Sequence, residues 1–132
     1  MKVNIVFPVL DEERRLEKGI HTTEAFLAKR RDIDAVITIV DNGSTDRTPD
    51  IIKELADVYS NIEYIRLSER GFGLAFREAV KRNRCDIIGY VDVDLSTDIH
   101  YLSKVMKAFE KYDDISVIKG NRLSGKSKVN GR

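Results

Sequence analysis

The chain has 132 residues, enough for one domain with a hydrophobic core and too few for two ordinary domains. Hydrophobic residues make up 42% and charged residues 34% of the chain, which is typical of a folded globular domain and excludes a disordered one. The net charge of +1 gives no overall basic field for nucleic acid. We therefore expect a single domain over residues 1–132 and no nucleic-acid partner.

The cellular compartment is indicated by the single cysteine, Cys85, which cannot form an intramolecular disulfide. A reducing compartment is the simpler assumption. No secretory leader and no apolar run of about 18 residues are recognisable, so we expect no membrane-spanning segment. Residues 116–132 contain basic side chains and no acid. This segment is either a solvated basic tail or an anion-binding loop.

The apolar pattern alternates between strand and helix along the whole chain. In chain order it predicts a strand at 3–7, a helix at 16–27, a strand at 35–40, a helix at 48–59, a strand at 62–67, a helix at 72–80, a strand at 86–91, a helix at 102–109 and a short strand at 115–118. This alternation favours right-handed crossovers. The fold class is therefore α/β, with a mainly parallel sheet and helices on both faces.

Two element boundaries rest on proline. Pro8 is expected to stop the first strand, because proline cannot donate a hydrogen bond to a neighbouring strand. Thr48 is expected to cap the second helix, with Pro49 at its first helical position.

Three polar clusters follow predicted strands, at residues 8–13, 41–46 and 92–96. The carboxyl ends of parallel strands lie at one edge of a sheet, and such sheets bind ligands beyond that edge where the strand order reverses. The three clusters together therefore predict a binding site, although each cluster alone is also compatible with ordinary loop chemistry.

Asp92 and Asp94 follow the apolar run that ends at Val91. On an extended backbone, side chains at positions i and i+2 point to the same side, so these carboxylates are expected to converge. Two converging acids need a positive partner, and a divalent cation carrying a phosphorylated ligand is the natural candidate. Oxygen ligands favour Mg²⁺ or Mn²⁺ over Zn²⁺. The alternative is that both acids are turn or cap residues.

Three further motifs have two readings each. Residues 41–44 form either a plain turn or a site where Asp41 accepts hydrogen bonds from a base or ribose. Residues 70–73 lack a full dinucleotide fingerprint, so a tight, close-packed turn is the simpler reading, although Arg70 could reach a phosphate. Arg122, just after a predicted strand, is either a surface residue or a phosphate ligand.

Taken together, the sequence resembles family 2 glycosyltransferases of the GT-A (Rossmann-like) fold, especially polyprenyl-phosphate (dolichyl-phosphate) hexose synthases. The resemblance extends over essentially the whole chain and rests on five motifs in order, at residues 8–12, 40–48, 69–75, 92–96 and 120–122. Three positions depart from the family pattern: Asp11 and Glu69 stand in place of asparagine, and Asn42 stands in place of a second acid.

The resemblance implies roles for particular residues. Nucleotide-sugar contacts are expected from Pro8, Leu10, Glu12, Asp41, Asn42, Gly43, Arg70, Gly73 and Asp92. Asp92, Asp94 and Ser96 are expected to hold the metal, with Asp94 as the more direct ligand. Arg122 is expected to face the acceptor phosphate or the diphosphate, and it completes the catalytic group with Asp92 and Asp94.

The implied reaction is the inverting, metal-dependent transfer of a hexose from a nucleoside diphosphate sugar, such as UDP-glucose or GDP-mannose, to a polyprenyl phosphate. The implied location is the cytoplasmic face of a membrane, with peripheral contact. Family members continue with amphipathic helices and often membrane segments, so we expect this chain to be an incomplete, C-terminally truncated catalytic core.

Three alternatives remain open at this point. A family 2 enzyme with a saccharide acceptor would share the same motifs. A nucleotidyltransferase usually has a basic glycine-rich loop after its first strand, whereas residues 8–15 contain no glycine. A receiver-like signalling module needs an aspartate after its third strand, where Leu67 and Ser68 stand instead.

Overall fold

The computed structural model describes residues 1–68, 71–95 and 99–112. The chain divides into two compact units, Met1–Ile99 and His100–Arg132. Within the described part of the second unit, α4 (Tyr101–Lys111) confirms the helix predicted at 102–109. The short strand predicted at 115–118 and the basic residues of 116–132 lie outside the described residues.

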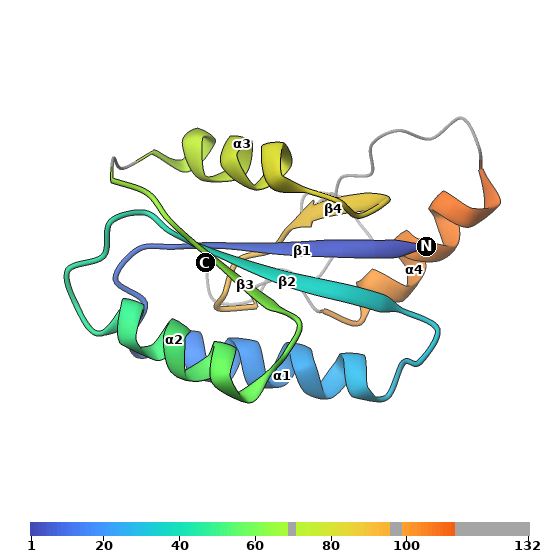
Figure 1. Ribbon diagram of the computed structural model, residues 1–132. Coiled ribbons are helices and arrows are strands. Elements are labelled where there is room, and N and C mark those ends of the chain that lie inside the picture. Colours follow the sequence, from blue (N-terminus) through green and yellow to red (C-terminus); the bar gives the residue numbers. More distant parts are fainter. Residues whose placement is uncertain (69–70, 96–98, 113–132) are drawn as a thin grey trace, which may run out of the picture. The chain divides into compact units, whose positions relative to one another are not determined.

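The first unit is built on a four-stranded sheet in the order β3-β2-β1-β4, with every neighbouring pair parallel. Its elements are β1 (Lys2–Val9), α1 (Leu16–Ala28), β2 (Asp34–Asp41), α2 (Thr48–Val58), β3 (Ile62–Arg66), α3 (Phe72–Arg82) and β4 (Ile87–Tyr90). Helices α1 and α2 lie on one side of the sheet and α3 on the other (Figure 1). The predicted parallel α/β fold with helices on both faces is confirmed.

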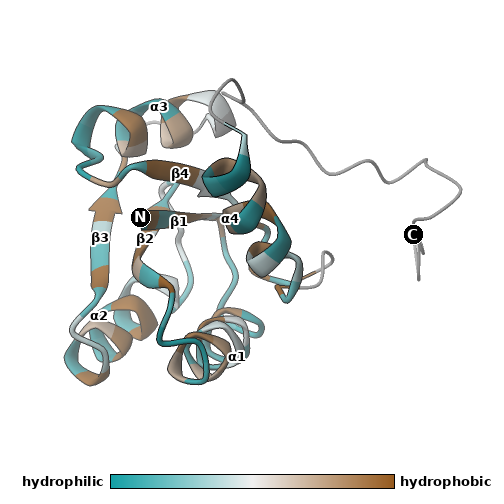
Figure 2. Ribbon diagram, turned by 90° about the vertical axis from the view of Figure 1, so that its right-hand side faces the viewer, coloured by the Kyte–Doolittle hydropathy of each residue, from teal (hydrophilic) through white to brown (hydrophobic). Residues whose placement is uncertain are grey.

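The core lies on both faces of β1 and β2, because apolar residues occupy both alternating sets of positions in these central strands. Under α3, Val6 and Val40 pack with Ala75 and Ala79. Phe7, the next residue after Val6, points to the other face of the sheet and is fully buried there. The helices carry both hydrophobic and hydrophilic residues (Figure 2), as expected for helices that cover a sheet with one face.

The strand boundary predicted at Pro8 is wrong, because β1 continues to Val9 and Pro8 is paired with Val40. The Val9 carbonyl faces β2, where it accepts the Asn42 N–H at 2.9 Å. The ring nitrogen of Pro8 therefore faces the β4 side. The pairing of β1 with β4 ends at Val6 and Tyr90, so no residue of β4 lies opposite Pro8. The lack of an N–H at Pro8 therefore costs the sheet no hydrogen bond.

Thr48 is the first residue of α2, not the cap that precedes the helix. Its backbone N–H donates to Asp46 Oδ1 at 2.8 Å, so Asp46 satisfies the free N–H of this helix end. Pro49 is therefore the second residue of α2, one position later than predicted, and still lies in the first turn, where proline is tolerated.

No helix in the described ranges is both long enough and apolar enough to span a bilayer.

Candidate functional site at the carboxyl edge of the sheet

The strand order reverses between β1 and β4, since β2 and β3 lie on one side of β1 and β4 lies on the other. The Val91 N–H donates to the Val6 carbonyl at 2.9 Å, so the segment after β4 leaves the sheet beside Val6, three residues before β1 ends at Val9. This is a topological switch point, the place where open parallel sheets bind ligands. Two of the three predicted clusters, residues 8–13 and 92–96, begin here.

The loops after β1 and β2 are joined by hydrogen bonds. The Asp11 N–H donates to Ser44 Oγ at 2.9 Å, and Asp11 Oδ1 accepts the Thr45 N–H at 2.8 Å. The Glu12 N–H donates to Thr48 Oγ1 at 2.9 Å. The predicted proximity of these two loops is therefore confirmed, and Thr48 ties α2 to the loop before α1.

Asp11 adopts a left-handed backbone conformation, with φ of 50°. Aspartate and asparagine are the side chains that tolerate this region best after glycine, and either has an oxygen that can accept the Thr45 N–H. The replacement of the family's asparagine by Asp11 therefore keeps the loop geometry. Gly43, with φ of 83°, provides the corresponding turn after β2.

Asp41 is fully buried at the end of β2. Its Oδ1 accepts the Ser44 N–H at 2.9 Å, whereas its Oδ2 has no hydrogen-bond partner within the described residues. Arg66 Nη1, from a half-exposed side chain on β3, lies 3.6 Å from Oδ2, which is close enough for charge attraction but beyond hydrogen-bond length. Buried polar atoms are nearly always paired, so this oxygen is a candidate acceptor for a ligand.

Asn42 presents a second such atom, because its Oδ1 is also buried and has no partner in the described ranges. Its backbone N–H is bonded to Val9 and extends the pairing of β1 and β2 by one residue. Pro8 and the exposed Leu10 lie at the end of β1 beside these residues.

Asp92 and Asp94 lie on a turn, because β4 ends at Tyr90 and the Leu95 N–H donates to the Asp92 carbonyl at 2.9 Å. Leu95 has a left-handed φ of 53°. The inference that both side chains share one side of an extended strand is therefore wrong, since the strand has already ended. Asp92 Oδ1 instead accepts the Tyr90 hydroxyl at 2.7 Å.

Arg15 is a positive partner of Asp94 that the sequence reasoning missed. Its guanidinium makes two hydrogen bonds to the Glu12 carboxylate, at 2.7 and 2.8 Å, and its Nη1 lies 3.8 Å from Asp94 Oδ2. Glu12, expected as a nucleotide contact, is thus engaged by Arg15. The three-residue spacing of Glu12 and Arg15 was the available signal.

A concavity of about 330 Å³ opens here, lined by Asp11, Glu12, Glu13, Arg14, Arg15 and Asp46. Desolvation raises the pKa of Asp46, but hydrogen bonds from the side chain and backbone of Thr48 and from the Glu13 backbone outweigh it, so the pKa is lowered overall. Asp46 therefore stays ionised down to a lower pH than an ordinary aspartate.

The acidic turn offers two carboxylates to a metal ion, those of Asp92 and Asp94. The described residues contain no group of three His, Cys, Asp or Glu side chains that could hold an ion. Mg²⁺ commonly binds through one or two carboxylates, with substrate phosphates and water filling the remaining positions. Asp92 and Asp94 fit that chemistry. Ser96, Arg70 and Arg122 lie outside the described residues, so their predicted roles stay predictions.

Gly73 lies exposed in the first turns of α3, and an added Cβ would meet no described atom within 4 Å. The close packing predicted for its turn is therefore wrong at this position. No contact of Gly73 with the rest of the site is seen in the described residues, and its role as a nucleotide-sugar contact stays a prediction.

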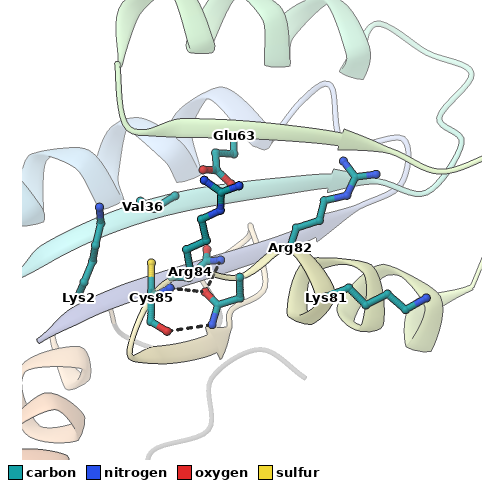
Figure 3. Close-up of a pocket in the computed structure, with 9 residues that line it drawn as sticks. Lys2, Val36, Glu63, Lys81, Arg82, Arg84 and Cys85 are labelled. Atoms are coloured by element: carbon teal, nitrogen blue, oxygen red, sulfur yellow. Dashed lines mark hydrogen bonds between the residues drawn. The ribbon is translucent and has the colours of Figure 1, made fainter.

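A larger concavity of about 910 Å³ lies at the opposite, amino-terminal end of the strands. Figure 3 shows Arg84 and Glu63 extending toward one another there. Asn83 hydrogen-bonds the backbone of Cys85 and the buried Asn4, which in turn accepts from Thr38 at 2.7 Å. None of the predicted site residues lines this concavity.

The sheet order, the helix layers and the acidic turn at the switch point define a GT-A glycosyltransferase fold. Among solved structures, it is similar to the mannosyltransferase PcManGT from Pyrobaculum calidifontis in complex with GDP-Man and Mn²⁺, with a TM-score of 0.69, 23% identity, and coverage of 80% of this chain and 31% of that one. S. aureus TarS 1-349 in complex with UDP-GlcNAc gives a TM-score of 0.67 at 20% identity, covering 86% of this chain and 32% of TarS.

The family model described as Glycosyl transferase family 2 matches residues 4–131, and the chain belongs to this family. A similar curated protein is the dolichyl-phosphate beta-glucosyltransferase ALG5D of Trichomonas vaginalis, 31% identical over 96% of this chain and 42% of its own length. Another is the dolichol-phosphate mannosyltransferase of Pyrococcus furiosus, 26% identical over 93% of this chain and 35% of its own length. The chain thus spans less than half the length of these relatives.

Proposed function

We propose that this chain is the nucleotide-binding core of a glycosyltransferase that moves a hexose from a nucleoside diphosphate sugar to a polyprenyl (dolichyl) phosphate, with inversion at the anomeric carbon. The observation that carries the proposal is the buried Oδ2 of Asp41 at the carboxyl edge of the sheet, which accepts no hydrogen bond from the described residues. Family membership and the dolichyl-phosphate transferases among the similar proteins support it.

Asp41 would recognise the base. Its Oδ1 is already used by Ser44, so Oδ2 offers one acceptor to a ligand N–H. Uracil offers N3–H and guanine offers N1–H, and both bases present a carbonyl next to that N–H. Arg66, 3.6 Å from Oδ2, carries donors that suit such a carbonyl. Cytosine has no N–H at the equivalent ring position and would not fit this pairing.

Asp92 and Asp94, with Ser96, would hold Mg²⁺ or Mn²⁺ together with the diphosphate. When bound, the metal supplies charge neutralisation for the departing diphosphate. The positive charge of Arg15 lies beside the same turn, so it would lower the repulsion between the Asp94 carboxylate and the phosphates. The expected contacts of Leu10 and Gly43 with the nucleotide belong to this proposal.

The acceptor needs little activation. A phosphate monoester is already an oxyanion at neutral pH, so attack on the anomeric carbon from the face opposite the leaving group requires no strong general base. Arg122 would pair with the acceptor phosphate or the diphosphate. The basic side chains of residues 116–132 would draw the chain to anionic lipid at the cytoplasmic face of a membrane.

Calorimetry with UDP-glucose and GDP-mannose, in Mn²⁺ and in EDTA, tests the donor and the metal. We expect one donor to bind more tightly in Mn²⁺, and Asp94→Asn to remove that gain. Unchanged affinity of Asp94→Asn in Mn²⁺ would show that the metal assignment is wrong. Product analysis with a polyprenyl phosphate and with a saccharide tests the acceptor, and transfer to the saccharide alone would exclude the proposed one.

A further inference from the structure

We infer that Gly19 on α1 is a positioning residue for the acidic turn, because it lets the backbone of Val93 approach the helix and so fixes the directions of Asp92 and Asp94. The inference rests on the proposed function, in which these two acids hold the metal.

The close approach is specific to glycine. A Cβ added at Gly19 would lie 2.2 Å from the Val93 carbonyl oxygen and 3.0 Å from Val93 Cγ2. The first distance is far below van der Waals contact, and the atom that would have to yield is backbone. Both residues are buried, and Val93 has only 4% of its surface exposed. Any side chain at position 19 must therefore displace the turn, the helix or both.

The turn transmits such a displacement to both acids. Val93 is the residue between Asp92 and Asp94, so a rotation of its carbonyl reorients the peptide units next to each of them. The turn is closed by the bond from Leu95 N–H to the Asp92 carbonyl, and Leu95 already adopts an unfavourable left-handed φ of 53°. The turn therefore has little conformational freedom with which to absorb a shift.

The same side of α1 meets the turn at a second point. Arg15 lies one helical turn before Gly19, as shown by the 3.0 Å bond from the Gly19 N–H to the Arg15 carbonyl, and Arg15 approaches Asp94. Glycine is among the least favourable residues inside a helix. Its presence at the fourth position of α1 is explained by this contact with Val93 and not by helix formation.

The test compares Gly19→Ala with Gly89→Ala as the control, because an added Cβ at Gly89 meets no described atom within 4 Å. UDP and GDP affinities are measured in Mn²⁺ and in EDTA. We expect the metal-dependent gain in affinity to fall roughly 10- to 100-fold in Gly19→Ala, as for other residues that orient metal ligands. Affinity in EDTA, which reflects contacts such as that of Asp41, should match the wild type, as should both affinities of Gly89→Ala.

The outcomes separate this inference from the proposed function. Equal wild-type affinities in Mn²⁺ and in EDTA would overturn the metal assignment itself. A metal-dependent gain that is present in the wild type and survives in Gly19→Ala would overturn the positioning role alone. An equal loss of nucleotide affinity in Mn²⁺ and in EDTA would also overturn the positioning role. General destabilisation of the fold would explain such a loss without any specific effect on the metal ligands.

A second measurement uses only the wild-type chain, so it does not depend on the folding of a variant. Mn²⁺ added with UDP or GDP should broaden the NMR signal of the Gly19 amide, which lies against the residue between the two acids. The Ala28 amide, about 14 Å further along the same helix, should be broadened much less. A sharp Gly19 signal at Mn²⁺ levels that broaden Asp92 and Asp94 would overturn the inference.

Discussion

Arg15 Nη1 lies 3.8 Å from Asp94 Oδ2, which joins the first helix of the domain to a turn almost eighty residues later in the chain. The same guanidinium is held by Glu12 through two hydrogen bonds. The positive charge next to Asp94 is therefore fixed in place before any ligand binds.

Removing the Arg15 charge should strengthen the binding of a free cation. A guanidinium this close to Asp94 repels Mn²⁺, but both side chains are partly exposed, at 57% and 31%, so solvent screens the effect. We expect Arg15→Gln to bind Mn²⁺ about two- to fivefold more tightly at low salt, with a smaller difference at high salt. Electron paramagnetic resonance of free Mn²⁺ measures this.

Arg14→Gln is the matched control, because Arg14 is an arginine next to Arg15 that lines the same concavity. Weaker Mn²⁺ binding by Arg15→Gln than by Arg14→Gln would show that Arg15 holds Asp94 in its binding position and does not compete with the cation.

Asp41→Asn should reduce nucleotide binding without weakening the fold. The amide keeps an oxygen for the Ser44 N–H but places an NH₂ group where the ligand N–H is expected to donate. We expect nucleotide affinity to fall by about 1.5–3 kcal/mol, the usual value for a hydrogen bond to a charged group. The free energy of unfolding should be unchanged or higher, because a buried, half-paired carboxylate is removed.

Calorimetry and urea unfolding of the same preparation measure both quantities for Asp41→Asn. A large loss of stability with unchanged nucleotide affinity would assign Asp41 to the architecture of the β2–α2 loop alone.

Asp46 should make the domain less stable in acid. Its pKa is lowered in the folded state by the Thr48 and Glu13 hydrogen bonds, so its contribution to stability is fully present above the ordinary aspartate pKa of about 3.9 and is lost as the pH falls through the lowered value. We expect the free energy of unfolding of the wild type to fall more steeply below about pH 4 than that of Asp46→Asn. Parallel curves for the two proteins would contradict the pKa shift.

Phe7→Ala should be strongly destabilising, because Phe7 is fully buried in the central strand β1. Removing a buried phenylalanine leaves a cavity and typically costs about 3–5 kcal/mol. Val58→Ala is the control, since Val58 is 66% exposed at the end of α2 and should change stability by less than about 0.5 kcal/mol. Urea unfolding measures both variants, and similar effects of the two would place Phe7 outside the core.

Most of the fold could be predicted because each buried element carries its own periodic pattern. The run at residues 35–40 predicted β2, and the spacing of apolar residues around Ala75 and Ala79 predicted α3. The end of β1 was wrongly predicted at Pro8 because the outcome depends on another strand. Proline is tolerated inside β1 only because β4 ends before it reaches Pro8. No pattern around Pro8 itself records where β4 ends.

The candidate site could be located from the sequence but not resolved in detail. Strand ends marked the loops, and the motifs named Asp41, Asp92 and Asp94 as candidates whose roles stay predictions. The turn at Asp92–Leu95 was missed because a left-handed Leu95 has no sequence signal. Arg15 and Gly19 were missed because their contacts are with residues more than seventy positions away in the chain.

The hydrogen bonds between Asp11 and the residues at 44–45 make the loops after β1 and β2 a single body. The loops beside Asp41 are therefore preorganised for a ligand, and little of the binding free energy is needed to order the protein. A change of donor preference within such a framework would come from exchanging individual side chains, with the backbone unchanged.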